Sequence, residues 1–306
     1  MRLMASPDRE TLDRFQGLMA GIVIGDVLGH PVEGHRTVSE MYLEEIRTKP
    51  RSLVYTDDTA MSIAVAESLL GCDGFDGADM AKRFADEYQA NPFRGYGRNV
   101  VDVFERVSNG VHWETAAQVQ FDGTGSYGNG AAMRVGPVAL WAYPDLETTR
   151  RVAAETARVT HTHPIGVEGA VIQATAAHHA LGQGYDPDRL LSDLNRLGET
   201  EEFRAKLDML ENCLDRDDDE RARLHLGNWV AAHNSVVTAL YCFLLATDFE
   251  DAILRAIRMG GDTDTIASMT GALAGARFGI DSVPDIWREV EGFEHMIDLA
   301  TSLSLR

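Results

Sequence analysis

Helical periodicity is the feature of this 306-residue chain that most limits its fold. Apolar residues recur at positions i, i+3, i+4 and i+7 through most of its length, as they do along the buried face of an α-helix. Alternating Val, Ile and Thr with hairpin turns is nearly absent, which argues against β-strands. The pattern predicts helices over residues 13–30, 57–70, 78–89, 97–108, 130–142, 146–160, 164–181, 187–197, 199–214, 229–246, 249–259, 263–278 and 284–302.

These segments predict an all-α fold, a compact single-domain bundle of roughly a dozen helices. No Pro/Gly/Ser-rich linker and no internal repeat divides the chain, so residues 1–306 are expected to form one domain. In the first helix, the small residues Gly17, Ala20, Gly21 and Gly25 recur at helical spacing. This spacing predicts a helix that packs tightly against a neighbour.

Charge and cysteine content bear on the partners and the compartment. The formal net charge is −20 without any cluster of Lys and Arg, so the surface would repel nucleic acid and anionic membranes. Cys72, Cys213 and Cys242 are widely spaced and form no CxxC motif, which favours a reducing cytosol. The N-terminus has no signal-peptide core, and the longest apolar stretch, around 238–246, is shorter than the ~20 residues of a membrane helix. We therefore expect a cytoplasmic monomer that binds neither nucleic acid nor membranes.

Two short acidic motifs, one near each end of the chain, carry the strongest functional signal. They are TDDT at residues 56–59 and GGDTDT at residues 260–265, and a helical segment of small apolar residues follows each. Each motif alone reads as a helix start, with Thr56 as an N-cap and aspartates in the first turn. If the two motifs meet in space, their carboxylates repel one another unless a cation lies between them. Hard oxygen ligands of this kind suit Mg²⁺, Mn²⁺ or Ca²⁺ rather than zinc.

A glycine-rich segment, GTGSYGNG at residues 123–130, precedes an apolar run. Its glycines let the backbone approach a ligand closely and direct N–H groups at it. The N-terminus of the helix that follows would face the same point, an arrangement suited to a diphosphate. The segment lacks the GK[ST] of a P-loop. On its own it could equally be a flexible surface loop.

Other polar segments offer candidate catalytic and binding residues. Glu33 lies in a loop bounded by glycine and proline, where a carboxylate can act as a mobile acid or base over a metal site or can simply be exposed. His161 and His163 are two residues apart, so one helix face cannot present both, and a hard cation does not favour imidazole. A ligand contact by His161 is therefore the better hypothesis. The charge run at 215–220 lacks the glycine and the distant glutamate of an EF-hand and is expected to be a solvated loop.

In their order and spacing, these motifs resemble those of a known family. The segments GDVLGHPVEG, YTDDTAMSIAVAESLL, GTGSYGNGAAMRVGP, THTHPIGVEGA and MGGDTDTIASMTGALAGARFG are similar to the ADP-ribosylglycohydrolase family, and the match runs from Phe15 to Leu303. This family includes the enzyme that removes ADP-ribose from dinitrogenase reductase and the animal ADP-ribosyl-acceptor hydrolases. The segments SYGNGAAMR and LGNWVAAHNSVVTALYCFL resemble most closely its serine-directed, poly(ADP-ribose)-degrading branch.

The resemblance implies a binuclear centre of two Mg²⁺ ions, with Mn²⁺ as the alternative, in a cleft of the all-α fold. The metal ligands that it implies are Thr56, Asp57, Asp58, Asp262, Asp264 and Thr265. The substrate-binding residues that it implies are Phe121, Gly125, Ser126, Tyr127, Gly128, Asn129 and His161. The loop 125–129 would hold the diphosphate, with Phe121, Tyr127 and His161 near the adenosine. Thr124 stands where the animal branch has a basic residue, which puts one phosphate contact in doubt.

The implied activity is hydrolysis of the C1″ glycosidic bond between ADP-ribose and protein side chains, with serine O-linkage favoured. O-linked poly(ADP-ribose) and O-acetyl-ADP-ribose are further candidate substrates, so ADP-ribose and ADP-ribosylated proteins are the expected partners. Cleavage would pass through an oxocarbenium-like state, with Glu33 and Asp262 as acid and base in either order. Three alternatives remain: an arginine-directed hydrolase, a phosphohydrolase that cleaves the diphosphate, and a non-catalytic ADP-ribose-binding protein.

Overall fold

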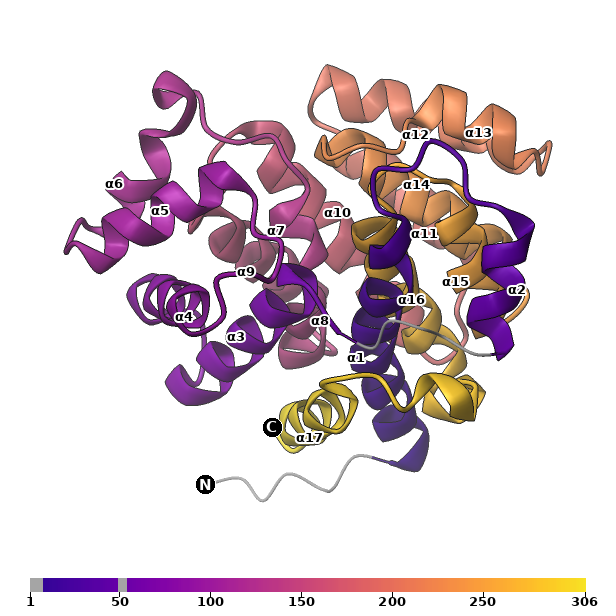
Figure 1. The fold of residues 1–306 in the computed structure, drawn as a ribbon, viewed down its shortest axis with the longest axis horizontal. Coiled ribbons are helices and arrows are strands. Elements are labelled where there is room, and N and C mark those ends of the chain that lie inside the picture. Colours follow the sequence, from indigo (N-terminus) through magenta and orange to yellow (C-terminus); the bar gives the residue numbers. More distant parts are fainter. Residues whose placement is uncertain (1–7, 49–53) are drawn as a thin grey trace.

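The computed structural model describes residues 8–48 and 54–306, which form an array of α-helices (Figure 1). The helices are α1 (Arg9–Gly29), α2 (Glu40–Thr48), α3 (Asp57–Cys72), α4 (Gly77–Ala90), α5 (Arg98–Ser108), α6 (Trp113–Gln118), α7 (Gly130–Met133), α8 (Gly136–Ala142), α9 (Leu146–Arg158), α10 (Pro164–Leu181), α11 (Pro187–Leu197), α12 (Glu201–Leu214), α13 (Asp219–Leu226), α14 (Ala232–Leu245), α15 (Phe249–Arg258), α16 (Thr263–Phe278) and α17 (Phe293–Ser304). Short 3₁₀ turns are η1 (His30–Val32), η2 (Gln120–Gly123), η3 (Ile280–Ser282) and η4 (Asp285–Trp287). The described residues contain one isolated β-bridge and no strand, so the prediction of an all-α fold is confirmed.

Helices α1 and α16 form the tightest pair in the molecule. A methyl group added at Gly21 would overlap the backbone carbonyl of Gly271, and one added at Gly25 would overlap that of Ala267. Two helix backbones can approach this closely only where side chains are absent or minimal. The tight neighbour predicted from the glycine spacing of the first helix is therefore confirmed, and it is α16.

The α1–α16 pair also brings the ends of these two helices together. Gly17 lies against Gly275, whereas Gly29, at the other end of α1, lies against the backbone of Asp264. The two helices are thus antiparallel, and the last turn of α1 meets the first turn of α16. This contact places the loop that carries Glu33 beside the second acidic motif.

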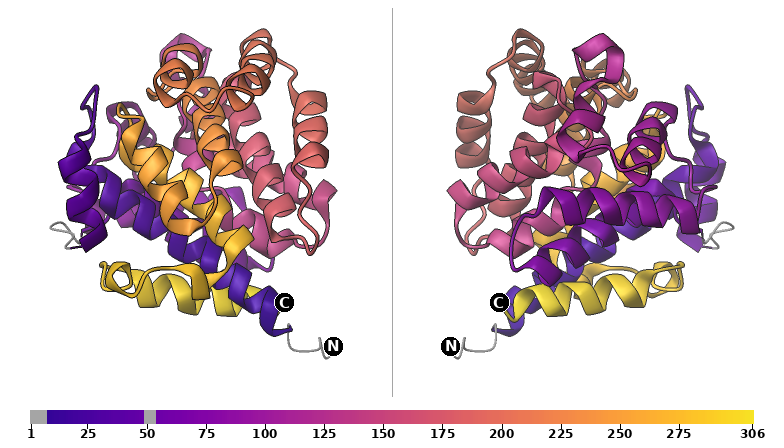
Figure 2. Two further views of the ribbon diagram at one scale, coloured as in Figure 1. Left: turned by 90° about the vertical axis from the view of Figure 1, so that its right-hand side faces the viewer. Right: turned by 90° about the vertical axis from the view of Figure 1, so that its left-hand side faces the viewer.

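The remaining helices cover this central pair. Helices α3, α8, α10, α15 and α17 contact α1, while α10, α14 and α15 also contact α16. Helix α17 lies across one end of the molecule, as the two side views show (Figure 2). The buried apolar side chains of the described residues form one continuous core.

The first helix contains a longer apolar segment than the stretch around 238–246 that the sequence analysis identified. The segment Arg9–Val32 is long and apolar enough to cross a membrane by length and composition, but 83% of its most apolar window is buried inside the protein. A helix that is apolar on all sides is expected where other helices surround it. Its apolar character is therefore explained by its place in the core.

Several predicted boundaries differ from the structure. The predicted helix 130–142 is divided into α7 and α8, because Pro137 in the first turn of α8 supports a new helix start and cannot continue the old one. The last predicted helix begins only at Phe293, after Gly292 with a φ of 82°. Helices α2, α6 and α13 were not predicted, and α13 begins inside the acidic run, where Asp218 caps it. The expectation of a solvated loop is therefore wrong from residue 219 onward.

Candidate active site

The two acidic motifs meet at one cavity of about 300 Å³. Helices α3, α5, α7 and α16 contribute to its walls, together with the glycine-rich loop. The six residues predicted as metal ligands all line it: Thr56, Asp57, Asp58, Asp262, Asp264 and Thr265. A direct hydrogen bond joins the two motifs, since Thr265 Oγ1 donates to Asp58 Oδ2 at 3.2 Å. Segments 207 residues apart in the chain thus form one group of carboxylates and hydroxyls.

A buried carboxylate of α1, Asp26, holds the first motif in place. The Oγ1 and N–H of Thr56 donate to it at 2.8 and 3.0 Å, and those of Thr59 donate at 2.6 and 3.1 Å. Thr56 does occupy the N-cap position of α3, but its side chain makes no capping hydrogen bond because Asp26 accepts it. Asp26 was not among the predicted site residues. Its signal in the sequence was a lone aspartate within the apolar run GIVIGDVLG.

A glycine turn positions the second motif. Gly260 and Gly261 have φ values of 68° and 75°, which glycine adopts without strain. The N–H of Gly261 donates to the His35 carbonyl, and the N–H of Gly34 donates to the Gly261 carbonyl, both at 2.8 Å. The N–H of Asp262 donates to the backbone carbonyl of Asn228 at 2.8 Å. These bonds join the turn to the loop after α1 and to the segment before α14, so that the first turn of α16 faces the cavity.

Crowding of the carboxylates disfavours their ionised forms. Burial, followed by repulsion from Asp26 and Asp264, raises the pKa values of Asp57 and Asp58 well above the usual range. Burial and the neighbouring Asp264 raise the pKa of Asp262 to about 8, although the amide of Asn129 donates to it at 2.6 Å. A cation between these groups would offset the repulsion. The all-oxygen donor set of the six residues fits a hard divalent cation.

Asp58 provides a specific sign that this group is incomplete without a ligand. Its Oδ1 atom is buried and accepts no hydrogen bond from the described residues. A buried carboxylate oxygen without a partner costs free energy, and such atoms in native proteins usually face an ion or an ordered water. The free oxygen therefore fits a cation bound between α3 and α16.

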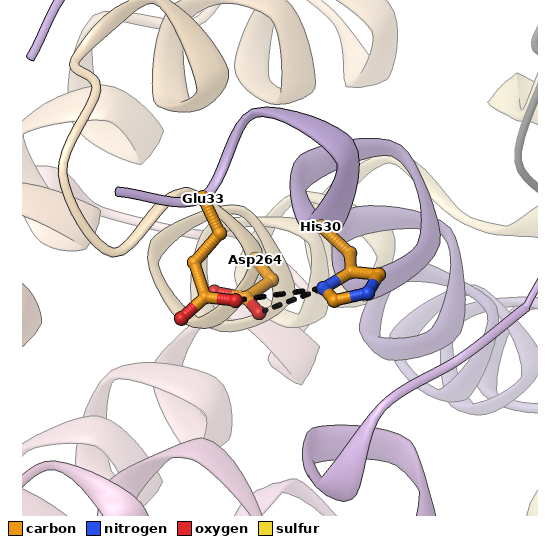
Figure 3. A group of neighbouring side chains, drawn as sticks. All are labelled: His30, Glu33 and Asp264. Atoms are coloured by element: carbon orange, nitrogen blue, oxygen red, sulfur yellow. Dashed lines mark ion pairs between the residues drawn. The ribbon is translucent and has the colours of Figure 1, made fainter. Parts of the chain in front are cut away.

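Glu33 lies half-exposed on the loop between α1 and α2 and reaches the edge of the same cavity. Its Oε2 atom is 3.5 Å from His30 Nδ1, which in turn is 3.7 Å from Asp264 Oδ2 (Figure 3). Burial and the nearby Asp264 raise the pKa of Glu33. A carboxyl with a raised pKa can hold a proton for a leaving oxygen or accept one from water.

The predicted substrate-binding residues fall into two groups. Ser126, Gly128, Asn129 and His161 line the cavity. Gly125, Tyr127 and Phe121 lie outside its walls. Gly125 has a φ of 79° and packs against Thr162, and Tyr127 is half-exposed with its ring edge against His163.

Phe121 belongs to a second, smaller hollow beside the first. Its ring is nearly half-exposed, and its backbone has a φ of 50°, in the left-handed region. This hollow shares Asn99 and Gln120 with the main cavity. Phe121 therefore stands next to the cavity, separated from it by one shared wall.

Two buried basic side chains lie beneath the glycine-rich loop. His161 shares a hydrogen bond of 2.7 Å with the hydroxyl of Thr160, and burial lowers its pKa to about 3, so the ring is neutral. Arg134 donates to the carbonyls of Gly130 and Thr156 and to the Thr160 hydroxyl. Burial lowers the pKa of Arg134 to about 9. The donors of Arg134 are thus largely used in supporting the loop.

Arg98 was missed by the sequence analysis. It is exposed at the first position of α5, lines the cavity, and makes no ion pair or hydrogen bond within 8–48 and 54–306. No side chain caps α5, so the positive end of this helix dipole also faces the cavity beside Gly97 and Asn99. By contrast, the helix after the glycine-rich loop, α7, has only four residues, so the predicted contribution of its N-terminus is small.

Comparisons with known proteins show the family of this chain. The model of the ADP-ribosylglycohydrolase family matches residues 7–306. The ADP-ribosylhydrolase ARH3 of Mus musculus is 37% identical over 96% of this chain and 91% of its own length. The ADP-ribosyl-[dinitrogen reductase] glycohydrolase of Rhodospirillum rubrum is 27% identical over 90% of this chain and 89% of its own. A solved structure titled "ADP-ribosylglycohydrolase-related protein complex" has a TM-score of 0.75 and 26% identity over 97% of this chain and 98% of that one. The chain therefore belongs to the ADP-ribosylglycohydrolase family.

Proposed function

We propose that this protein is a metal-dependent hydrolase that cleaves the C1″ glycosidic bond of ADP-ribose attached to protein side chains, with serine O-linkage favoured. The observation that carries the proposal is the meeting of both acidic motifs in one cavity that the glycine-rich loop helps to line. Family membership and the names of the relatives, among them ADP-ribosylhydrolase ARH3 of Homo sapiens at 37% identity, support it.

The proposed cofactor is a pair of Mg²⁺ ions, with Mn²⁺ as the alternative. The ligands would be Thr56, Asp57, Asp58, Asp262, Asp264 and Thr265. When bound, the cations would supply Lewis-acid chemistry, orienting the ribose hydroxyls and lowering the pKa of a water. They would also supply the positive charge that an anionic substrate needs in a protein of net charge −20.

The residues of the chain would move the protons. The pKa values of Glu33 and Asp262 are both raised, so each carboxyl holds a proton more readily than it would in water. One would protonate the serine oxygen as it leaves, and the other would take a proton from water. The amide of Asn129 orients Asp262 by its hydrogen bond.

The substrate would lie along the cavity with its distal ribose at the acidic end. The diphosphate would lie against the loop Gly125–Asn129, with Phe121, Tyr127 and His161 near the adenosine. The partners are accordingly ADP-ribose and ADP-ribosylated proteins. The proposal also places a monomeric enzyme in the cytoplasm, and the three unpaired cysteines fit a reducing compartment.

The test is release of free ADP-ribose from a serine-linked ADP-ribosyl peptide, with an arginine-linked peptide in parallel, in Mg²⁺ and in EDTA. We expect the wild type to release ADP-ribose from the serine peptide in Mg²⁺ and not in EDTA. Asp57→Ala or Asp264→Ala should abolish this release while leaving the helical circular dichroism spectrum intact. Glu33→Gln should bind ADP-ribose but lose rate.

Each contrary outcome would indicate a different function. Release from the arginine peptide only would make the protein an arginine-directed hydrolase. AMP as the released product, with ribose phosphate left on the peptide, would identify a phosphohydrolase. ADP-ribose binding without release from either peptide would identify a binding protein. Full activity of Asp57→Ala would refute the metal centre.

A further inference from the structure

We propose that His30 supplies a nitrogen ligand to the cation that Asp264 holds, which would give this centre a mixed nitrogen and oxygen donor set. This inference rests on the proposed function, because it concerns the same metal centre. Neither the family motifs nor the sequence pattern assigned a role to His30. The observations that support it are the positions of His30, Glu33 and Asp264 (Figure 3).

The local fold brings these three side chains to one point. His30 and Glu33 stand three residues apart across the 3₁₀ turn η1, and side chains at this spacing lie on the same side of such a turn. Gly29 lies directly against the backbone of Asp264, and the Thr263 hydroxyl donates to the Gly29 carbonyl at 2.8 Å. The α1–α16 contact therefore sets His30 beside the carboxylate of Asp264.

The separations between the three groups suit a shared cation better than they suit hydrogen bonds. His30 Nδ1 is 3.5 Å from Glu33 Oε2 and 3.7 Å from Asp264 Oδ2, and one ligand atom from each residue lies within 4.8 Å of the others. Two ligand atoms that each lie about 2.1 Å from a cation, with a ligand–cation–ligand angle of about 110–120°, are roughly 3.4–3.6 Å apart. Hydrogen bonds of this type are about 2.7–2.9 Å long. A cation could thus contact the group with little movement of the side chains.

The nitrogen itself has no other partner. Nδ1 of His30 is buried and makes no hydrogen bond within the described part of the chain, although the imidazole as a whole is partly exposed. Glu33 and Asp264 line the cavity whereas His30 does not, so the nitrogen would approach the cation from outside the substrate space. The competing interpretation is a protonated His30 that only pairs with the two carboxylates.

A nitrogen ligand has a chemical consequence for metal choice. Imidazole binds Co²⁺, Ni²⁺, Zn²⁺ and Fe²⁺ more readily than Mg²⁺, which prefers oxygen and retains its waters. The centre of this protein should therefore favour transition metals over Mg²⁺ more strongly than the six oxygen ligands alone would. Only His30 has to be altered to remove that preference.

The test is electron spin-echo envelope modulation of the full-length protein loaded with Mn²⁺, a measurement that detects a coordinated imidazole nitrogen. Wild type and the control His35→Ala, an exposed histidine of the same loop, are expected to show the ¹⁴N coupling. His30→Ala and His30→Gln are expected to lose it while still binding Mn²⁺. In calorimetric titrations, His30→Ala should weaken Co²⁺ binding by about 10–100-fold, the range known for altered metal surroundings, and Mg²⁺ binding far less.

The outcomes separate this inference from the proposed function. Mn²⁺ binding to wild type without ¹⁴N coupling, or coupling that persists in His30→Ala, would overturn the role of His30 and leave the oxygen centre standing. If wild type binds no divalent cation at all, the metal centre of the proposed function fails together with this inference. Equal losses of Co²⁺ and Mg²⁺ affinity in His30→Ala would indicate a structural role and would also overturn it.

Discussion

At the scale of single residues, the site depends on a carboxylate that lies outside the cavity. Asp26 accepts four hydrogen bonds from Thr56 and Thr59 and so fixes the start of α3, where three of the proposed metal ligands lie. Its environment is fully buried, and burial raises its pKa to about 6. The threonine donors offset part of this cost by lowering the pKa.

Replacing Asp26 by Asn should therefore disturb metal binding although none of the proposed metal ligands is replaced. The amide would present N–H groups to donors that need an acceptor, and changes of this kind in metal surroundings typically cost about 10–100-fold in affinity. Isothermal titration with Mg²⁺ measures the effect. Asp298→Asn, an exposed aspartate of α17, is the control and should change nothing. Unchanged Mg²⁺ affinity in Asp26→Asn would refute the positioning role.

Arg98 is the residue on which we expect anion affinity to depend. Arg134, the other arginine of the cavity wall, is committed to carbonyls, so Arg98 is the free side-chain cation that a diphosphate would meet among the described lining residues. Charge-assisted hydrogen bonds contribute about 1.5–3 kcal/mol, and the exposure of Arg98 places it near the lower end. Arg98→Ala should therefore weaken ADP-ribose binding about tenfold and reduce its dependence on salt. Arg158→Ala, an exposed arginine at the end of α9, should bind as wild type does, whereas equal affinity in Arg98→Ala would exclude this contact.

At the scale of secondary-structure elements, the α1–α16 contact sets the geometry of the site. The same row of glycines that lets the backbones touch also brings the end of α1 to the start of α16. A sequence shows the glycine spacing on α1, but it does not show which helix will receive it. Complementary small residues on α16, Ala267, Gly271 and Gly275, make that helix the partner.

Gly21→Ala should therefore destabilise the protein. Its new methyl group would overlap the Gly271 carbonyl, and overpacking of this kind usually costs about 1–3 kcal/mol or more, a fall of several degrees in the melting temperature. The matched control is Gly71→Ala on α3, where the added methyl meets only the flexible end of Arg83 and alanine favours the helix. The melting temperatures of both variants, measured by thermal unfolding, test this prediction. A Gly21→Ala protein as stable as Gly71→Ala would show that the contact can relax.

At the scale of the whole molecule, the carboxylate cluster links stability to pH and to metal. Asp262, with a pKa of about 8, and Asp57 and Asp58, with raised pKa values, retain protons that the unfolded chain releases near pH 4. Above about pH 7.5 the unfolded histidines, with an ordinary pKa of about 6.5, are mostly neutral, so these carboxyls dominate the difference in bound protons. The native state then binds more protons than the unfolded state, and stability must fall as pH rises.

The metal-free protein should accordingly lose about 1.4 kcal/mol per pH unit for each retained proton as the pH rises from about 7.5 towards 8. Mg²⁺ competes with these protons, so its stabilising effect should grow over the same range. Melting temperatures in EDTA and in Mg²⁺ at several pH values measure both effects. Asp262→Asn should flatten the metal-free curve. A metal-free melting temperature that is constant or rises over this range would contradict the assignment.

The helix-rich fold and the acidic, hydroxyl-rich character of the two motifs were readable from the sequence, because helical periodicity and clustered oxygen ligands are local properties. The tertiary structure decided which segments meet. It joined Asp58 to Thr265 across the chain, assigned the Thr56 hydroxyl to Asp26 rather than to a cap, and brought Arg98 and His30 to the site. None of these contacts has a local signature, since each joins segments that are far apart in the sequence and meet only in the folded chain.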